Sequence, residues 1–98
     1  MDVSDLTTQL GALEHAIRSR GATGFSVFGS RARGDHRPDS DLDGLIDYDP
    51  ARRFSLLDLV AIERLIQEQL GIRADLTTRP ALHPLLRERI EAEAVRVF

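Results

Sequence analysis

The amino-acid sequence predicts an α+β fold in which a small mixed β-sheet is covered on one face by helices. Apolar residues recur at helical spacing in three segments, and three shorter segments have the pattern of strands. Their order is helix, strand, strand, helix, strand, helix, which favours a two-layer arrangement. The chain has 98 residues, the size of a single domain, so we assign residues 1–98 to one unit.

The first half of the chain contains one helix and two strands in this prediction. A helix is expected from about residue 5 to residue 20, with Ser4 as its N-cap and Gly21 at its end. The segment 25–28 is expected to form a short strand, followed by a loop or irregular helix at 31–40. A second strand, 42–48, ends at Asp49-Pro50. The apolar stripe of the helix consists of Leu6, Leu10, Leu13 and Ile17.

The second half alternates helix and strand. A longer helix is expected from about residue 55 to residue 70, stopped by Gly71, and a third strand at 72–77. A last helix, roughly 82–94, would face inward through Leu85, Leu86 and Ile90.

Composition excludes several classes of function. There is no cysteine and no lysine, which removes disulfides, thiolate metal sites and Schiff-base chemistry. A net charge of −3 argues against a protein that binds nucleic acid stably by a broad basic face. No segment is apolar for long enough to span a membrane, and the acidic N-terminus does not resemble a secretory signal, so we expect a cytoplasmic protein.

Two aspartates in the second strand point to a metal site. Side chains alternate along a strand, so Asp41 and Asp43 share one face while Leu42 and its apolar neighbours share the other. If the third strand is adjacent, Asp75 joins them. Three carboxylates on one open surface would suit two Mg²⁺ ions that clamp a phosphoryl group. The alternatives are a solvated strand end and, for Asp75, a surface ion pair with Arg73 or Arg79.

The end of the first strand has the residues of a phosphate-binding turn. Gly29 allows the backbone to approach an anion closely, and the hydroxyl and amide of Ser30 can bind phosphate oxygens. Arg31 and Arg33 follow directly and keep their charge at any physiological pH, although solvated loop arginines are equally common.

These residues resemble a known signature. Gly29-Ser30, ten intervening residues and Asp41-Leu42-Asp43 are similar to the G-S-x10-D-x-D motif of the DNA polymerase beta-like nucleotidyltransferase superfamily. The stretch FGSRARGDHRPDSDLD resembles its minimal nucleotidyltransferase branch, whose proteins are encoded beside HEPN-domain partners. The segments IRADLTT and IEAEAVRVF resemble its third carboxylate strand and its C-terminal end, so the likeness covers nearly the whole chain.

The resemblance implies a role for each matching position. Asp41 and Asp43 would bind catalytic Mg²⁺, Asp75 would complete the site and assist deprotonation of the attacking hydroxyl, and Gly29 with Ser30 would hold the triphosphate. The implied reaction transfers AMP from ATP to a tyrosine of a HEPN toxin, which makes the protein an antitoxin in a hetero-oligomer. Gly44 departs from the family pattern, which has a bulky aliphatic residue there. The direction of the neighbouring Asp43 side chain therefore needs to be checked in the structure.

Two other functions remain open. A non-catalytic antitoxin could neutralise its toxin by occlusion, with a degenerate site. Alternatively, the acceptor could be a small molecule, although related enzymes of that kind usually carry an added acceptor domain.

Overall fold

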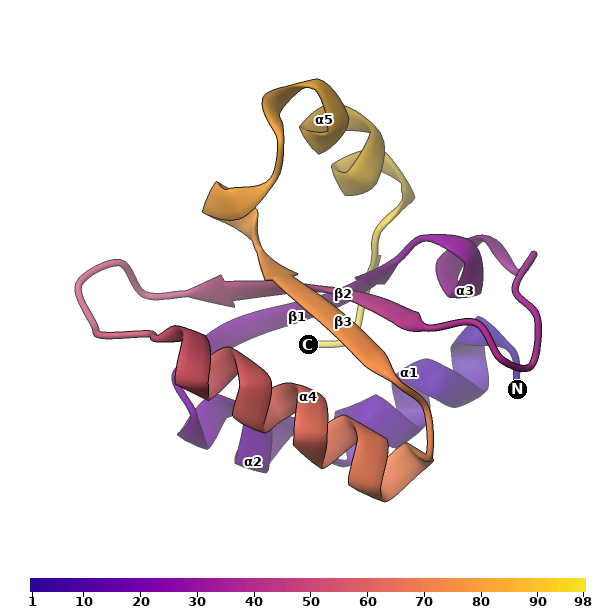
Figure 1. Cartoon of the computed structure of the whole chain (residues 1–98), viewed down its shortest axis with the longest axis horizontal. Helices are drawn as coiled ribbons and strands as arrows, with labels where there is room; N and C mark the ends of the chain where they lie inside the picture. Colours follow the sequence, from indigo (N-terminus) through magenta and orange to yellow (C-terminus); the bar gives the residue numbers. More distant parts are fainter.

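The computed structural model describes all 98 residues as a four-stranded sheet with helices packed on it (Figure 1). None of the helices has the length and apolar character needed to cross a membrane. In chain order the elements are α1 (Val3–Gly11), α2 (Glu14–Ser19), β1 (Ala22–Phe28), α3 (Ser30–Arg33), β2 (Leu42–Tyr48), α4 (Leu56–Leu70), β3 (Ala74–Thr78), the 3₁₀ turn η1 (Arg79–Ala81), α5 (Pro84–Glu93) and β4 (Val95–Arg96).

The sheet is mixed and has the strand order β3-β2-β1-β4. Strand β1 runs antiparallel to both β2 and β4, whereas β2 and β3 are parallel. Parallel neighbours require a crossover connection, which α4 supplies. The three expected strands and the mixed sheet are therefore confirmed. The short edge strand β4 was not expected; it begins at Val95, directly after the expected end of the last helix.

Helices α1, α2 and α4 cover one face of the sheet (Figure 1). Side chains from these helices and from alternate positions of the strands form one core, as the strand alternation predicted. Tyr48 lies at the end of β2, where it is partly exposed and stacks on Phe54 with ring centroids 5.2 Å apart. The fully buried members of the core include Leu10, Ile17, Phe25, Val27, Leu42, Ile46, Ile62 and Ile66.

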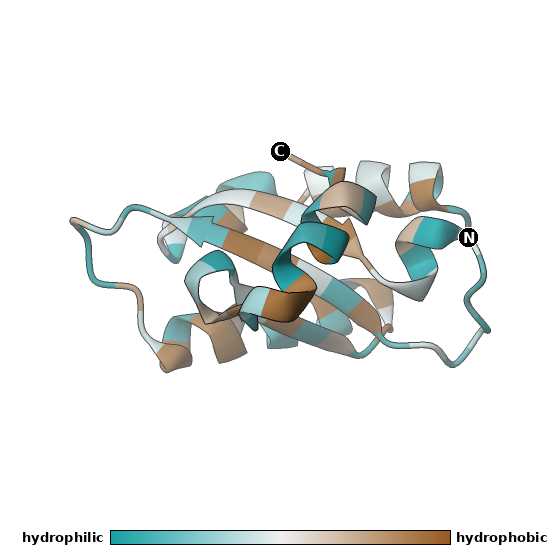
Figure 2. Ribbon diagram, turned by 90° about the horizontal axis from the view of Figure 1, so that it is seen from above, coloured by the Kyte–Doolittle hydropathy of each residue, from teal (hydrophilic) through white to brown (hydrophobic).

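Helix α5 lies on the opposite face, in front of the sheet when the molecule is seen from above (Figure 2). The expectation that its leucines face inward was wrong: Leu85 is 85% exposed and Leu86 is also exposed. Only a small apolar contact zone is buried on this face, at Leu45 and Leu82, and neither residue belongs to the main core. The helix therefore covers part of the face that carries the aspartates, instead of adding to the core.

The ends of the helices have local causes. The expected single N-terminal helix is two helices, because the chain turns at Ala12 and Leu13 between α1 and α2. Asp2, and not Ser4, is the N-cap, since its carboxylate accepts from the Asp5 N–H at 2.8 Å. Helix α4 begins with a capping box formed by Ser55 and Asp58.

Candidate active site

The turn after β1 lies against the carboxylate of Asp43. Gly29 has φ of 75°, a left-handed value that favours glycine, and it caps the short helix α3 that begins at Ser30. A Cβ at Gly29 would overlap the carboxylate of Asp43. Glycine is therefore required here for two reasons, backbone conformation and close approach, and the turn lies directly against Asp43.

Arg31 has a structural role in the fold, which corrects its assignment as a phosphate ligand. It is only 4% exposed, and its guanidinium donates to the carbonyl oxygen of Ser40 at 2.8 and 3.0 Å and to that of Pro38 at 3.4 Å. These bonds hold the connector between α3 and β2. Because the guanidinium is buried among carbonyl groups, we expect Arg31 to fix the spacing between the turn and Asp41 without touching a ligand.

Arg33 lies at the end of α3, and its side chain is partly exposed. Its Nε donates to Asp35 at 3.2 Å and its Nη1 donates to both oxygens of Glu93 at 3.3 Å. These hydrogen bonds raise the pKa of Arg33, so the guanidinium stays charged. None of these bonds uses Nη2, which leaves donors for an anion.

The carboxylates lie on adjacent strands. Asp43 pairs with Asp75 across β2 and β3 and with Phe28 across β1 and β2, so it lies between the turn after β1 and the third aspartate. Paired positions on neighbouring strands are roughly 5 Å apart. Asp41 precedes β2 by one residue and is exposed, as is Asp75, while Asp43 is partly buried. The structure thus brings together Gly29, Asp43 and Asp75 and leaves Asp41 at the solvent edge of this group.

The pKa of Asp43 is raised above the usual value of an aspartate. Burial is the main cause of its raised pKa, followed by repulsion from Asp75 and then from Asp41. Arg33 opposes this shift with its positive charge, and Glu93 adds to it. Since each of these neighbours affects the ionisation of Asp43, they form one electrostatic group.

The donor set does not form a complete metal cage. No group of three or more acidic or histidine side chains lies close enough together to enclose an ion. Two carboxylates that face each other and repel are nevertheless the donors that hard cations prefer, and such cations commonly take remaining ligands from water and substrate phosphates. Asp43 and Asp75 therefore fit a site that is completed by a nucleotide, with Asp41 able to join.

Ion pairs on the same face do not involve the three aspartates. Arg79 binds Asp47 at 2.7 Å and Glu91 at 3.2 Å. The alternative that Asp75 is an ordinary ion-pair partner of Arg79 is therefore wrong. Asp47, which shares the strand face with Asp43, is linked through Arg79 of η1 to Glu91 of α5.

Gly44 fills a packing role. It is buried between Phe25 and Leu76, and a Cβ there would come within 2.8 Å of the Phe25 ring and closer still to Leu76. The pairing of β2 with β1 and β3 continues through Gly44 without a bulge. The larger neighbours occupy the volume of the missing side chain, so Gly44 does not change the direction of Asp43.

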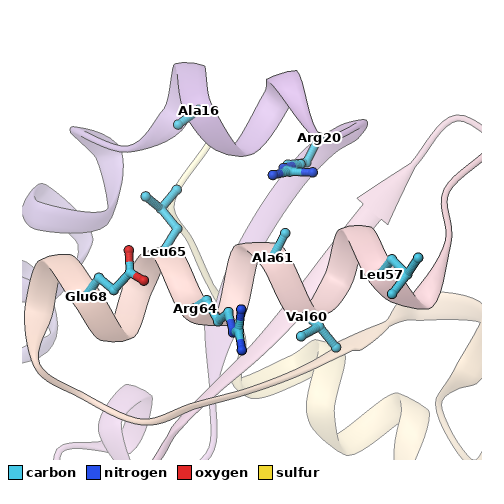
Figure 3. A pocket seen from close by; sticks show the side chains of 8 residues that line it. All are labelled: Ala16, Arg20, Leu57, Val60, Ala61, Arg64, Leu65 and Glu68. Atoms are coloured by element: carbon cyan, nitrogen blue, oxygen red, sulfur yellow. The ribbon is translucent and has the colours of Figure 1, made fainter.

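Two hollows flank the sheet at different distances from the carboxylates. One, of about 350 Å³, lies along β3 and α4 and includes Asp41, Asp75, Arg64 and Arg73 in its lining. The other, of about 490 Å³, lies between α2 and α4 and contains none of the expected site residues (Figure 3). It is lined by Ala16, Arg20, Leu57, Val60, Ala61, Arg64, Leu65 and Glu68.

Comparison with known sequences identifies the family. The sequence profile described as the nucleotidyltransferase domain matches residues 12–97. The chain belongs to this family. A protein adenylyltransferase, MntA of Thermococcus cleftensis, is 31% identical over 98 residues, which cover 99% of this chain and 97% of MntA. A candidate protein adenylyltransferase of Methanocaldococcus jannaschii is 42% identical over 86 residues, 88% of this chain and 85% of that protein.

Solved structures agree with this nucleotidyltransferase assignment. One described as a candidate minimal nucleotidyltransferase has a TM-score of 0.81 and 37% identity, and the match covers 97% of this chain and 95% of that chain. A toxin–antitoxin structure with AMP-PNP has a TM-score of 0.73 at 14% identity, covering 92% of this chain and 72% of that one, and supports the fold alone. The chain is a minimal nucleotidyltransferase, and the predicted fold class is confirmed.

One residue of this nucleotidyltransferase site was missed by the sequence interpretation. Glu93, at the end of α5, accepts a hydrogen bond from the Gly29 N–H at 3.0 Å as well as those from Arg33. By sequence, the segment that contains it resembles only the usual C-terminal end of the family. Since 64 residues separate Glu93 from Gly29, no local pattern predicts the contact.

Proposed function

We propose that this minimal nucleotidyltransferase transfers AMP from ATP to a hydroxyl group, that the acceptor is a tyrosine of a HEPN-domain toxin, and that the modification silences the toxin. The observation that carries the proposal is the register that sets Asp43 against Gly29 on one side and Asp75 on the other. A phosphate-binding turn and paired carboxylates then lie on one surface, as phosphoryl transfer requires.

The turn after β1 would hold the triphosphate. The first amides of a helix lack partners within the helix, so those of Ser30 and Arg31 are suitable donors to phosphate oxygens. The Ser30 hydroxyl and the Nη2 group of Arg33 would add two further donors. These groups would bind the pyrophosphate part of ATP and stabilise it as it leaves.

Asp41, Asp43 and Asp75 would hold Mg²⁺, with two ions expected. When bound, the ions would neutralise phosphate charge and stabilise the entering and leaving oxygens. Asp75 would also accept the proton of the acceptor hydroxyl. The hydroxyl oxygen forms a bond to the α-phosphorus, the bond from that phosphorus to the bridging oxygen breaks, and pyrophosphate leaves with the electron pair.

The positions of these groups suggest the side from which the acceptor approaches. Entering and leaving oxygens lie roughly in line across the transferred phosphorus. The phosphate-binding turn is on the β1 side of Asp43, so the acceptor would enter from the β3 side. The hollow that includes Asp41, Asp75, Arg64 and Arg73 lies on that side.

The toxin partner is supported by the relatives and by the surface of this chain. MntA is named a protein adenylyltransferase, and the structure with AMP-PNP is named a toxin–antitoxin. Large apolar side chains are exposed at the start of α4 and on α5, as expected for a protein that joins a cytoplasmic hetero-oligomer. They are Leu56, Leu57, Val60, Leu85 and Leu86.

The test combines the purified chain with the HEPN-domain protein that we expect to be encoded beside its gene, using ATP labelled on the α-phosphate and Mg²⁺. We expect label on the partner with wild type, none with Asp43→Asn, and normal labelling with the control Asp39→Asn, which changes an exposed loop aspartate. Toxicity should be relieved only by chains that transfer label. Relief of toxicity without label by both wild type and Asp43→Asn would instead indicate occlusion.

If neither labelling nor relief occurs with the partner, a small-molecule acceptor becomes the stronger hypothesis. The matching measurement is the formation of labelled AMP conjugates of candidate hydroxyl compounds, compared between wild type and Asp43→Asn.

A further inference from the structure

The carboxylate of Glu93 lies against the phosphate-binding turn. One of its oxygens accepts from the Gly29 N–H at 3.0 Å, and both accept from Arg33 Nη1 at 3.3 Å. The side chain is only 18% exposed. It therefore connects the backbone of the turn to the arginine that we expect to contact phosphate.

Sheet pairing explains how Glu93 reaches this position. Strand β4 is antiparallel to β1, with Val95 opposite Val27 and Arg96 opposite Ser26. Continued by two residues, the same register brings Glu93 opposite Gly29. The two-residue strand at the C-terminal end thus fixes the position of a side chain at the site.

The Gly29 amide needs this partner. Gly29 is buried, and its left-handed backbone ends the pairing of β1, so its N–H has left the strand ladder. A buried amide without an acceptor is costly. Glu93 supplies the acceptor from the side chain and so holds the turn in the conformation that directs the next amides outward.

Arg33 is restrained by the same carboxylate. Asp35 binds Nε and Glu93 binds Nη1, which fixes the plane of the guanidinium and leaves Nη2 unused. A restrained guanidinium loses less rotamer entropy when it binds an anion than a free one does. Bonds to a carboxylate are also stronger than bonds between neutral groups.

We propose that Glu93 is a positioning residue for the triphosphate, acting through the Gly29 amide and the Arg33 guanidinium. The inference rests on the proposed function, because it assumes that this turn binds a nucleotide. Glu93 does not touch the reacting atoms in this account. Its effect is to hold two donor groups in their binding geometry.

The test is the affinity of the protein for AMP-PNP in the presence of Mg²⁺, measured by calorimetry. Glu93→Ala should raise Kd about tenfold, the effect expected when charge-assisted restraint of one phosphate contact is lost. Glu93→Gln should lie between wild type and Glu93→Ala, because its amide oxygen still accepts from Gly29 while its NH₂ group opposes the donor of Arg33. Glu91→Ala is the matched control, since Glu91 is on the same helix and binds Arg79 instead.

A double-mutant cycle separates positioning from general stabilisation. If Glu93 acts in part through Arg33, Glu93→Ala should cost less affinity in an Arg33→Ala background than in wild type. Unfolding curves of each variant give the stability change independently. If Glu93→Ala costs the same nucleotide affinity in both backgrounds, Glu93 does not act through Arg33, and only its contact with the Gly29 amide remains as a positioning contact.

The outcomes distinguish the two proposals. If wild type binds the nucleotide and both Glu93 variants bind it equally well or more tightly, the positioning role is overturned and Glu93 is either structural or a competitor of phosphate. If wild type itself does not bind, the proposed function fails, and the positioning role fails with it.

Discussion

The two faces of the sheet differ in what holds them together. The face covered by α1, α2 and α4 is closed by fully buried aliphatic and aromatic side chains. The face under α5 has a small apolar contact at Leu45 and Leu82, and otherwise ion pairs and the candidate site. Stability is therefore concentrated on one face and chemistry on the other. The aspartates can lie close together because they do not take the place of apolar side chains in the main core.

The largest effect should come from a large-to-small change in the core. Phe25 is fully buried at the centre of the sheet, so Phe25→Ala should lower the free energy of unfolding by about 3–5 kcal/mol. Leu85→Ala, on exposed α5, should change it by less than about 0.5 kcal/mol. Chemical denaturation measures both. Similar losses for the two variants would contradict the division between the faces.

Gly44 offers a sharper test within the core. Gly44→Val should destabilise by about 1–3 kcal/mol, because the added side chain overlaps Phe25 and Leu76. Combining it with Leu76→Ala should recover part of that loss, since the smaller alanine leaves room for the valine side chain. If Gly44→Val is as stable as wild type, the packing explanation for this departure from the family pattern is wrong.

The hollow beside β3 should control the acceptor and not the nucleotide. Arg64 and Arg73 are exposed in its lining, so changing both to alanine should raise KM for the partner protein about three- to tenfold with little change in nucleotide Kd. Arg37→Ala, in the exposed connector, is the control. A loss of nucleotide affinity in the double variant would place the nucleotide on this side instead.

The smallest effect concerns the stability of the site itself. The raised pKa of Asp43 means that folding disfavours its charged form, so Asp43→Asn should have a higher melting midpoint than wild type at pH 7. Below the unfolded pKa of an aspartate, about 3.9, both states are protonated and the difference should disappear. Melting curves of both proteins from pH 3 to pH 7 test this. A lower midpoint for Asp43→Asn at pH 7 would mean that the carboxylate stabilises the fold.

Most of the fold and part of the site follow from local sequence patterns. The alternation in 42–48 and the spacing of Gly29, Asp43 and Asp75 predict the strand faces, because a pleated strand has a strict period of two. The side of the sheet taken by α5 could not be predicted this way. The apolar residues of α5 suggested an inward face, but the helix is held on the other side by side-chain contacts of Arg79, Asp47, Glu91 and Glu93.

The roles of the two arginines also depended on tertiary contacts. Arg31 and Arg33 are equivalent by sequence position, yet one is buried against the connector and the other is partly exposed beside the aspartates. Only the direction of each side chain on the single turn of α3 distinguishes them. Long-range pairing of β4 with β1 determined the position of Glu93, and no local signal contains that information.

The most direct test of the division between the two faces is a crystal structure with AMP-PNP and Mn²⁺. The proposed function predicts anomalous density within about 2.3 Å of the carboxylates of Asp43 and at least one of Asp41 and Asp75, with the triphosphate against Gly29 and Ser30. Nucleotide bound in the hollow between α2 and α4, or metal bound away from these aspartates, would contradict it.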